Sequence, residues 1–133
     1  MSSRNGLRGE DMAKTVLIAE NEANLRLSLC YLMERQGYRV IEAEDGATAA
    51  ERVAADAPDL VLIGVDMKNR SGFDLCQSFR NDPARRAMKI IFVTSKARAV
   101  ERDKGMALGA DAYITKPFAN ADLLATVRDV LGN

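Results

Sequence analysis

Five short segments rich in valine and isoleucine recur along the chain, and most of them are apolar at nearly every position. They span residues 16–19, 39–43, 59–63, 89–93 and 112–114. Continuous apolar runs of this length are typical of strands in a parallel sheet that is covered on both faces. The pattern therefore predicts five strands of one buried sheet.

The segments between these strands carry apolar residues at helical spacing. Their apolar positions are Leu25, Leu29, Leu32 and Met33; Ala47, Ala50, Val53 and Ala54; Phe73, Cys76 and Phe79; Val100 and Met106; and Leu123, Leu124, Val127, Val130 and Leu131. Gly37 is placed to end the first helix, and Asp45 with Gly46 to begin the second. The alternation of strand and helix predicts an α/β fold, a doubly wound parallel sheet with right-handed crossovers and helices on both faces.

Length and charge limit the domain organisation, the location and the partners that we expect. The chain has 133 residues, and we expect one domain over residues 13–133 with no effector domain attached. Residues 1–12 contain charges and glycines but no apolar anchor, so a disordered, dispensable extension is expected. No apolar run has the length of a signal peptide or a membrane span, which favours a cytoplasmic location. The 19 basic and 19 acidic residues cancel, so neither nucleic acid nor a membrane is an expected partner.

The chain contains no histidine and two cysteines, Cys30 and Cys76. Without histidine it has no Ser-His-Asp or Cys-His nucleophilic site and no imidazole-bound zinc. It also cannot be the phosphohistidine donor of a phosphorelay. Neither cysteine has CxxC spacing, so we expect both to be buried, reduced thiols.

Four segments together resemble the receiver domain of bacterial response regulators, which belong to two-component and phosphorelay signalling. They are VLIAENE at 16–22, DLVLIGVDM at 59–67 followed by SGFDLC at 71–76, FVTSK at 92–96, and GADAYITKPF at 109–118. The resemblance implies a flavodoxin-like sheet of strand order 2-1-3-4-5, with its functional crevice at the carboxyl ends of the strands. It also implies that Cys30 and Cys76 lie on opposite faces of the sheet, too far apart for a disulfide.

In this family, the residue that matches Gly64 is the phosphoacceptor aspartate. Glycine carries no nucleophile, so the resemblance implies an atypical receiver, a pseudo-receiver, that cannot form an acyl phosphate at this position. A glycine at a strand end also leaves free space. Either the space stays open, or a ligand group or the side chain of Glu20 or Asp66 fills it.

The family's magnesium site is also altered. Two acidic residues after the first strand hold the ion with the acceptor, and the backbone carbonyl matching Asp66 contacts it. Here the pair is Glu20 and Asn21, and Asn21 offers only a neutral oxygen. Loss of a carboxylate at roughly 4 Å from a divalent ion forfeits about 8 kcal/mol of Coulomb attraction at an effective dielectric of about 20, before desolvation is considered. We expect magnesium binding by Glu20, Asn21 and Asp66 to be weak or absent, and no other cofactor. Glu22 is expected to complement the dipole of the first helix.

The residues that report phosphorylation in the family are present. Thr94 matches the hydroxyl that moves toward the phosphoryl group, and Tyr113 matches the aromatic side chain whose rotamer follows it. Lys116 and Pro117 match the lysine and the proline after a usually cis peptide bond. The sequence thus keeps the residues that respond to phosphorylation in a receiver and lacks the aspartate that accepts the phosphoryl group.

We therefore expect a stand-alone pseudo-receiver, not an enzyme, that acts through phosphorylation-independent protein–protein interaction. The expected partner is a histidine kinase or another regulator. The resemblance implies that it binds the surface formed by the helix at about 97–108, the strand at 112–114 and the last helix.

Two alternative functions stay open. Asp66 is a candidate displaced phosphoacceptor, although it lies on the order of 6 to 7 Å along the strand from residue 64. Phosphoryl transfer tolerates little misplacement of that kind. The emptied pocket is alternatively a sensor site for a nucleotide or another anion, although no glycine-rich phosphate loop supports this.

Overall fold

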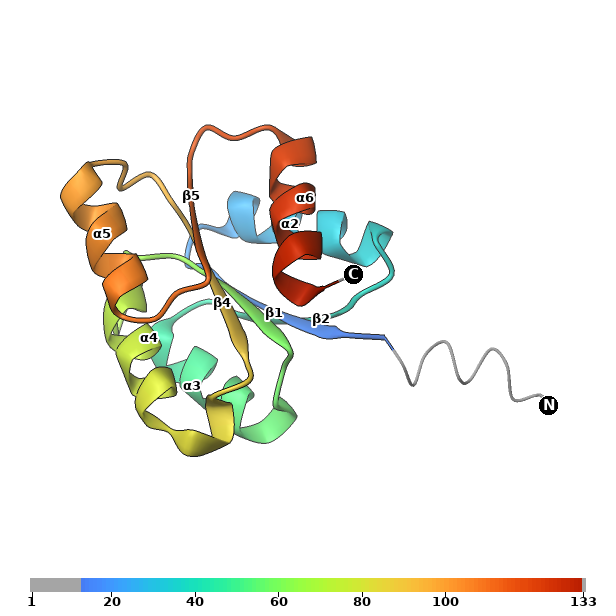
Figure 1. Cartoon of the computed structure of the whole chain (residues 1–133). Coiled ribbons are helices and arrows are strands. Elements are labelled where there is room, and N and C mark those ends of the chain that lie inside the picture. The colour runs from blue at the N-terminus through green and yellow to red at the C-terminus, as the bar shows by residue number, and fades with distance from the viewer. Residues whose placement is uncertain (1–12, 133) are drawn as a thin grey trace.

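The computed structural model describes residues 13–132 as an alternation of strands and helices (Figure 1). The strands are β1 (Thr15–Ala19), β2 (Arg39–Ala43), β3 (Leu60–Ile63), β4 (Lys89–Thr94) and β5 (Ala112–Thr115). The helices are α2 (Ala23–Arg35), α3 (Gly46–Asp56), α4 (Gly72–Asn81), α5 (Ala99–Ala107) and α6 (Asn120–Leu131), with a short 3₁₀ helix η1 (Pro83–Arg85). These elements confirm the predicted strands and helices.

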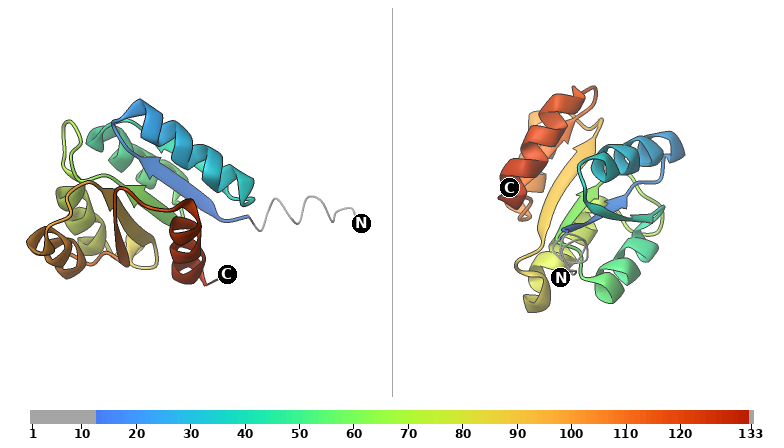
Figure 2. Two further views of the ribbon diagram at one scale, coloured as in Figure 1. Left: turned by 90° about the horizontal axis from the view of Figure 1, so that it is seen from above. Right: turned by 90° about the vertical axis from the view of Figure 1, so that its right-hand side faces the viewer.

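The strands are parallel and lie in the order β2-β1-β3-β4-β5, which confirms the predicted flavodoxin-like sheet. In its centre, Ala19 lies beside Ile63, and Ile63 lies beside Phe92. Helices α2 and α6 cover one face, and α3, α4 and α5 cover the other (Figure 1, Figure 2). Because the strand order reverses between β1 and β3, the carboxyl ends of these strands frame the expected crevice.

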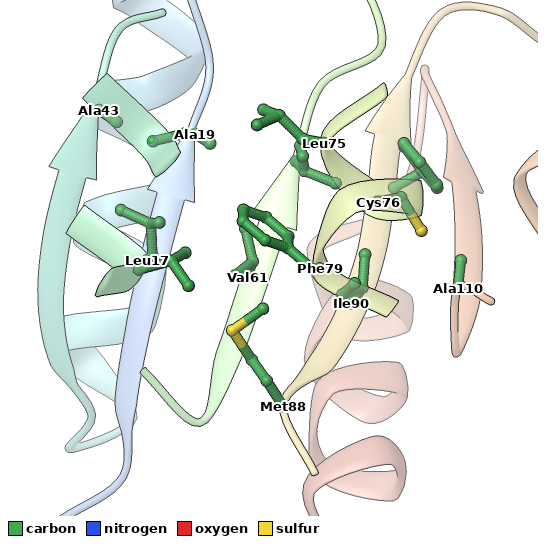
Figure 3. Packing of buried hydrophobic residues seen from close by; sticks show 14 of the residues in the cluster. Leu17, Ala19, Ala43, Val61, Leu75, Cys76, Phe79, Met88, Ile90 and Ala110 are labelled. Atoms are coloured by element: carbon green, nitrogen blue, oxygen red, sulfur yellow. The ribbon is translucent and has the colours of Figure 1, made fainter. Parts of the chain in front are cut away.

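Side chains of the buried strands alternate between two apolar clusters, one on each face. In β1, Val16 and Ile18 join the cluster beneath α2 and α6, whereas Leu17 and Ala19 join the cluster beneath α3 and α4. Figure 3 shows the second cluster, in which Phe79 of α4 packs onto the sheet. Burial of each large apolar side chain stabilises the fold by about 1.5–3 kcal/mol. The two clusters therefore hold the strand ends in fixed positions.

The predicted helix boundaries at Gly37 and Asp45 are confirmed. Gly37 follows α2 with a φ of 90°, a left-handed conformation that glycine adopts without strain. The Asp45 carboxylate accepts a hydrogen bond from the N–H of Thr48 at 2.8 Å and so caps the start of α3. Sequence alone was sufficient to place these ends.

Cys30 and Cys76 are free, buried and packed in opposite clusters, as predicted. Burial raises the pKa of each thiol to about 11.

The expected N-terminal extension, residues 1–12, lies outside the described residues. Within residues 13–132, no helix combines the length and apolar character needed to cross a membrane.

Candidate functional site

A pocket of about 150 Å³ lies where the carboxyl ends of the central strands meet. Its lining residues are Glu20, Asn21, Glu22, Gly64, Val65, Asp66, Val93, Thr94, Ser95 and Lys116. The fold thus brings together six of the predicted site residues from four separate segments. Tyr113 and Pro117 are not part of the lining.

The Glu20 side chain lies against the bare Cα of Gly64. A Cβ built on Gly64 would be 2.6 Å from Oε1 of Glu20, closer than real Cβ atoms approach other heavy atoms. The amide of Gly64 donates a hydrogen bond to the carbonyl of Ala19 at 2.9 Å, which fixes the backbone in this position. The space beside Gly64 is therefore occupied by the Glu20 carboxylate.

Glu20 is held in this position by its backbone and by its carboxylate. Its N–H donates to the carbonyl of Ala43 at 3.0 Å, and its own carbonyl accepts from the Arg26 guanidinium at 2.7 Å. Oε2 accepts from the N–H of Glu22 at 2.9 Å. Burial raises the pKa of the Glu20 carboxyl above its ordinary value, and the hydrogen bond from Glu22 and the charge of Lys116 oppose this shift.

The Asp66 side chain is oriented differently from Glu20. It is 72% exposed, and its Oδ2 lies 3.4 Å from Nζ of Lys96 at the pocket rim. A second rim pair joins Oε1 of Glu22 to Nζ of Lys116 at 3.8 Å. Glu22 is the N-cap residue of α2 and not part of its first turn, and its side chain faces Lys116 without making a capping hydrogen bond.

These residues fit a magnesium ion poorly. Glu20 is turned over Gly64, Asp66 is drawn outward to Lys96, and Asn21 carries no charge. Within residues 13–132 there is no group of three aspartate, glutamate, cysteine or histidine side chains arranged to hold a metal ion. Magnesium gives up its water reluctantly and depends on carboxylates, and two of those in the pocket lining, Glu22 and Asp66, are paired with lysines instead.

The two switch residues are joined through the backbone of Lys96. Its N–H donates to Oγ1 of Thr94 at 3.1 Å, and its carbonyl accepts from the hydroxyl of Tyr113 at 2.7 Å. Thr94 and Tyr113 are both buried. The Lys116–Pro117 peptide bond is cis, as the resemblance implied. The connection between pocket and aromatic side chain is therefore a short hydrogen-bonded path.

Three supporting residues were missed by sequence reasoning: Arg26, Lys96 and Arg102. Arg26 links the carbonyl of Glu20 to the carboxylates of β2 and the following loop. Arg102 donates to the carbonyl of Tyr113 at 3.1 Å, and its guanidinium lies 5.4 Å from the centre of the ring. A basic residue inside a predicted helix is usually solvent-facing, so the sequence offered no signal for the contacts of Arg26 and Arg102.

The chain matches the family model described as response regulator receiver domain over residues 16–128. The phosphate regulon transcriptional regulatory protein PhoB of Escherichia coli (strain K12) is 31% identical over 120 residues, which cover 90% of this chain and 52% of PhoB. The sensory transduction protein RegX3 of Mycolicibacterium smegmatis is 33% identical over 117 residues, which cover 88% of this chain and 50% of RegX3. The chain spans about half the length of these curated relatives.

Solved structures agree with this assignment. A putative response regulator from Chloroflexus aurantiacus J-10-fl superposes with a TM-score of 0.86 at 25% identity, covering 91% of this chain and 99% of that one. The signal receiver domain of a histidine kinase from Syntrophus aciditrophicus gives a TM-score of 0.84 at 27% identity, covering 90% of this chain and 91% of that one. The chain belongs to the response regulator receiver domain family.

Proposed function

We propose that this chain is a pseudo-receiver, a non-enzymatic module of two-component signalling that acts through protein–protein interaction without accepting phosphate. The observation that carries the proposal is the pairing of Gly64 with an inward Glu20. Gly64 supplies no nucleophile, and the carboxylate beside it is a negative charge where a phosphoryl group would have to sit. Two like unit charges about 4 Å apart repel by about 4 kcal/mol at an effective dielectric of 20.

The geometry disfavours Asp66 as a displaced acceptor. Its carboxylate is exposed and paired with Lys96. An acceptor must lie within a fraction of an ångström of the geometry needed for in-line transfer, and a mobile surface side chain does not provide this. Weak or absent magnesium binding is part of the same proposal.

We assign partner binding to the surface formed by α5, β5 and α6. Two large apolar side chains of α5 are exposed, Val100 at 64% and Met106 at 43%. The switch residue Tyr113 lies in β5 beneath this surface and contacts α5 through Arg102. Partner binding at α5 is therefore coupled to the pocket through the hydrogen bonds of Lys96. The proposed partner is a histidine kinase or another regulator, because the relatives of this chain include a sensory transduction protein and a receiver domain of a histidine kinase.

The first test is phosphoryl uptake. The chain is incubated with acetyl phosphate and magnesium, and its intact mass is followed by mass spectrometry. We expect no increase at any magnesium concentration. A stable gain of one phosphoryl group that disappears in Asp66→Asn would overturn the proposal and identify Asp66 as acceptor.

The second test is partner binding. The chain is screened in two-hybrid assays against histidine kinases and response regulators of the same genome, with Val100→Asp as the surface variant. A matched control is Tyr31→Asp, which introduces the same charge on the exposed side of α2. We expect a partner whose binding is lost in Val100→Asp and kept in Tyr31→Asp. Equal loss in both variants would contradict the assigned surface.

A small-ligand sensor is a second candidate because the pocket is large enough for a small group. Native mass spectrometry of the purified chain tests it, since a retained nucleotide or anion would appear as a defined mass shift.

A further inference from the structure

One oxygen of the Glu20 carboxylate lacks a hydrogen-bond donor among residues 13–132. Oε2 accepts from Glu22, whereas Oε1 lies over Gly64 at the pocket. Glu20 as a whole residue is only 7% exposed. A largely buried carboxylate oxygen without a donor in the protein is stabilised when a bound group donates to it. Oε1 is therefore able to accept a hydrogen bond from a group that binds in the pocket.

The other charges around the pocket already have partners. Asp66 pairs with Lys96 at 3.4 Å, and Glu22 pairs with Lys116 at 3.8 Å. No lysine or arginine of residues 13–132 forms an ion pair with Glu20. Lys116 and Arg26 act on the Glu20 carboxylate only from beyond ion-pair distance, so this carboxylate has no direct ionic partner among these residues.

The Glu20 carboxylate carries one negative charge, and its Oε1 has no hydrogen-bond donor within the described part of the chain. Such a site suits a monovalent cation that carries N–H groups. A divalent metal is disfavoured because the other two carboxylates that line the pocket, Glu22 and Asp66, already pair with Lys116 and Lys96. The pocket volume of about 150 Å³ is that of a cavity known elsewhere to admit benzene. A guanidinium group is smaller than benzene, so it fits with part of its alkyl stem. Asn21 also lines the pocket, and its neutral amide oxygen is a second hydrogen-bond acceptor.

We propose that the Glu20 pocket binds the guanidinium or primary ammonium group of an arginine or lysine side chain from a protein partner. This inference rests on the proposed function, because a phosphate-accepting pocket would instead take up an anion together with a divalent cation. Oε1 of Glu20 accepts the N–H donors, and the partner's charge neutralises the carboxylate. Such charge-assisted bonds are stronger in a water-poor pocket than at an exposed surface.

The position of the pocket supports a protein as the source of the cation. Ser95 and Lys116 line the pocket, and their loops lead directly into α5 and α6. A partner seated on the α5, β5 and α6 surface therefore borders the pocket.

The test is a titration of the ¹⁵N-labelled full chain with methylguanidinium at constant ionic strength, followed by NMR. We expect saturable shifts of the Gly64 and Thr94 amides, at least tenfold weaker binding in Glu20→Gln, and unchanged binding in the control Glu51→Gln. Glu51 is an exposed carboxylate of α3, far in sequence from the pocket. Tetramethylammonium has the charge but no N–H donors, and it should give no saturable shift.

Several outcomes would overturn the proposal. They are equal binding in Glu20→Gln, an equal response to tetramethylammonium, or a tighter saturable response of the same amides to magnesium. Binding of methylguanidinium only after Lys116→Met would show that Lys116 is itself the cation for Glu20, and would also overturn it. The comparison of the three cations uses the unmodified chain, so it decides the question even where a variant does not fold.

The source of the cation is tested with a capped Gly-Arg-Gly peptide and with free arginine. Binding of the capped peptide at least as tight as that of free arginine supports a protein side chain. A preference for free arginine overturns the protein source and assigns the pocket to a small molecule. Phosphoryl uptake is measured separately by mass, so absent cation binding without phosphoryl uptake overturns this inference alone.

Discussion

The Glu20 carboxylate fills the space that any side chain at residue 64 would enter. Oε1 of Glu20 lies 2.6 Å from the Cβ position of Gly64. Hydrogen bonds at the amide, the carbonyl and Oε2 hold Glu20 there. The two residues are therefore coupled: the glycine permits the inward carboxylate, and the carboxylate has to move before a larger residue fits.

This coupling predicts the effect of Gly64→Ala. The added methyl group displaces a buried carboxylate, and we expect the free energy of unfolding to fall by about 1 kcal/mol, at the low end of overpacking effects because the end of Glu20 can give way. In a Glu20→Ala background the same substitution should cost less. Urea denaturation of the four proteins measures this, and we expect an interaction energy of at least about 0.5 kcal/mol. Strictly additive effects would show that the two side chains do not compete for the space.

Gly105 of α5 yields a second prediction. In an isolated helix, alanine would be favoured there over glycine by about 1 kcal/mol. In the structure, a Cβ at residue 105 would lie 2.9 Å from Cδ2 of Tyr113 and 3.2 Å from Cδ2 of Phe92. The gain in helix propensity is therefore opposed by an overpacking cost of about 1–3 kcal/mol. We expect Gly105→Ala to leave stability unchanged or lower it, and to displace the Tyr113 ring.

The control for Gly105→Ala is Asp103→Ala, an exposed position on the same helix. We expect its effect on the free energy of unfolding to stay within about 0.5 kcal/mol. Thermal melts report stability, and the NMR signals of the Tyr113 ring report its position. A clear gain of stability in Gly105→Ala with unmoved ring signals would mean that α5 does not pack on Tyr113 as described.

Both cysteines should react slowly in the native state. With a pKa of about 11 instead of 9.0, each thiol is about a hundredfold less ionised near pH 8 than an ordinary thiol, and the thiolate is the reactive form. Mass spectrometry after iodoacetamide treatment should show no labelling until denaturant is added. Fast native labelling of Cys30 or Cys76 would contradict their burial.

The same thiols set a dependence of stability on pH. An unfolded thiol loses its proton near pH 9, whereas the native thiols hold theirs to about pH 11. The unfolded state therefore binds fewer protons between these values, and stability falls as pH rises through that window. Below pH 9 both states are protonated, and the thiols contribute no pH dependence.

Sequence predicted the scaffold better than the site. The valine and isoleucine runs fixed the strands because a sheet buried on both faces tolerates little else, and the fold then placed Glu20, Gly64 and Thr94 at one edge. Sequence named Glu20 as one of several groups that could fill the space beside Gly64 but did not choose among them, because a long side chain beside a glycine has several positions that local sequence does not distinguish. The role of Lys96 was equally hidden, since its backbone rather than its side chain joins Thr94 to Tyr113.

The last prediction concerns how firmly α5 is anchored to the sheet. Among its residues only Gly105 is buried, whereas α6 buries Leu123 and Val127 completely. Helices with few buried apolar side chains open at low free energy, so amides of α5 should exchange with solvent much faster than those of α6. A partner that binds α5 shifts its population toward one conformation, and its amides should then slow down while those of α6 stay as they were. Hydrogen exchange measured with and without the partner decides this, with α2 as an internal reference. Equal protection of α5 and α6 in the free chain would leave the phosphate-independent switch without a moving element, and the domain would then act as a rigid docking module.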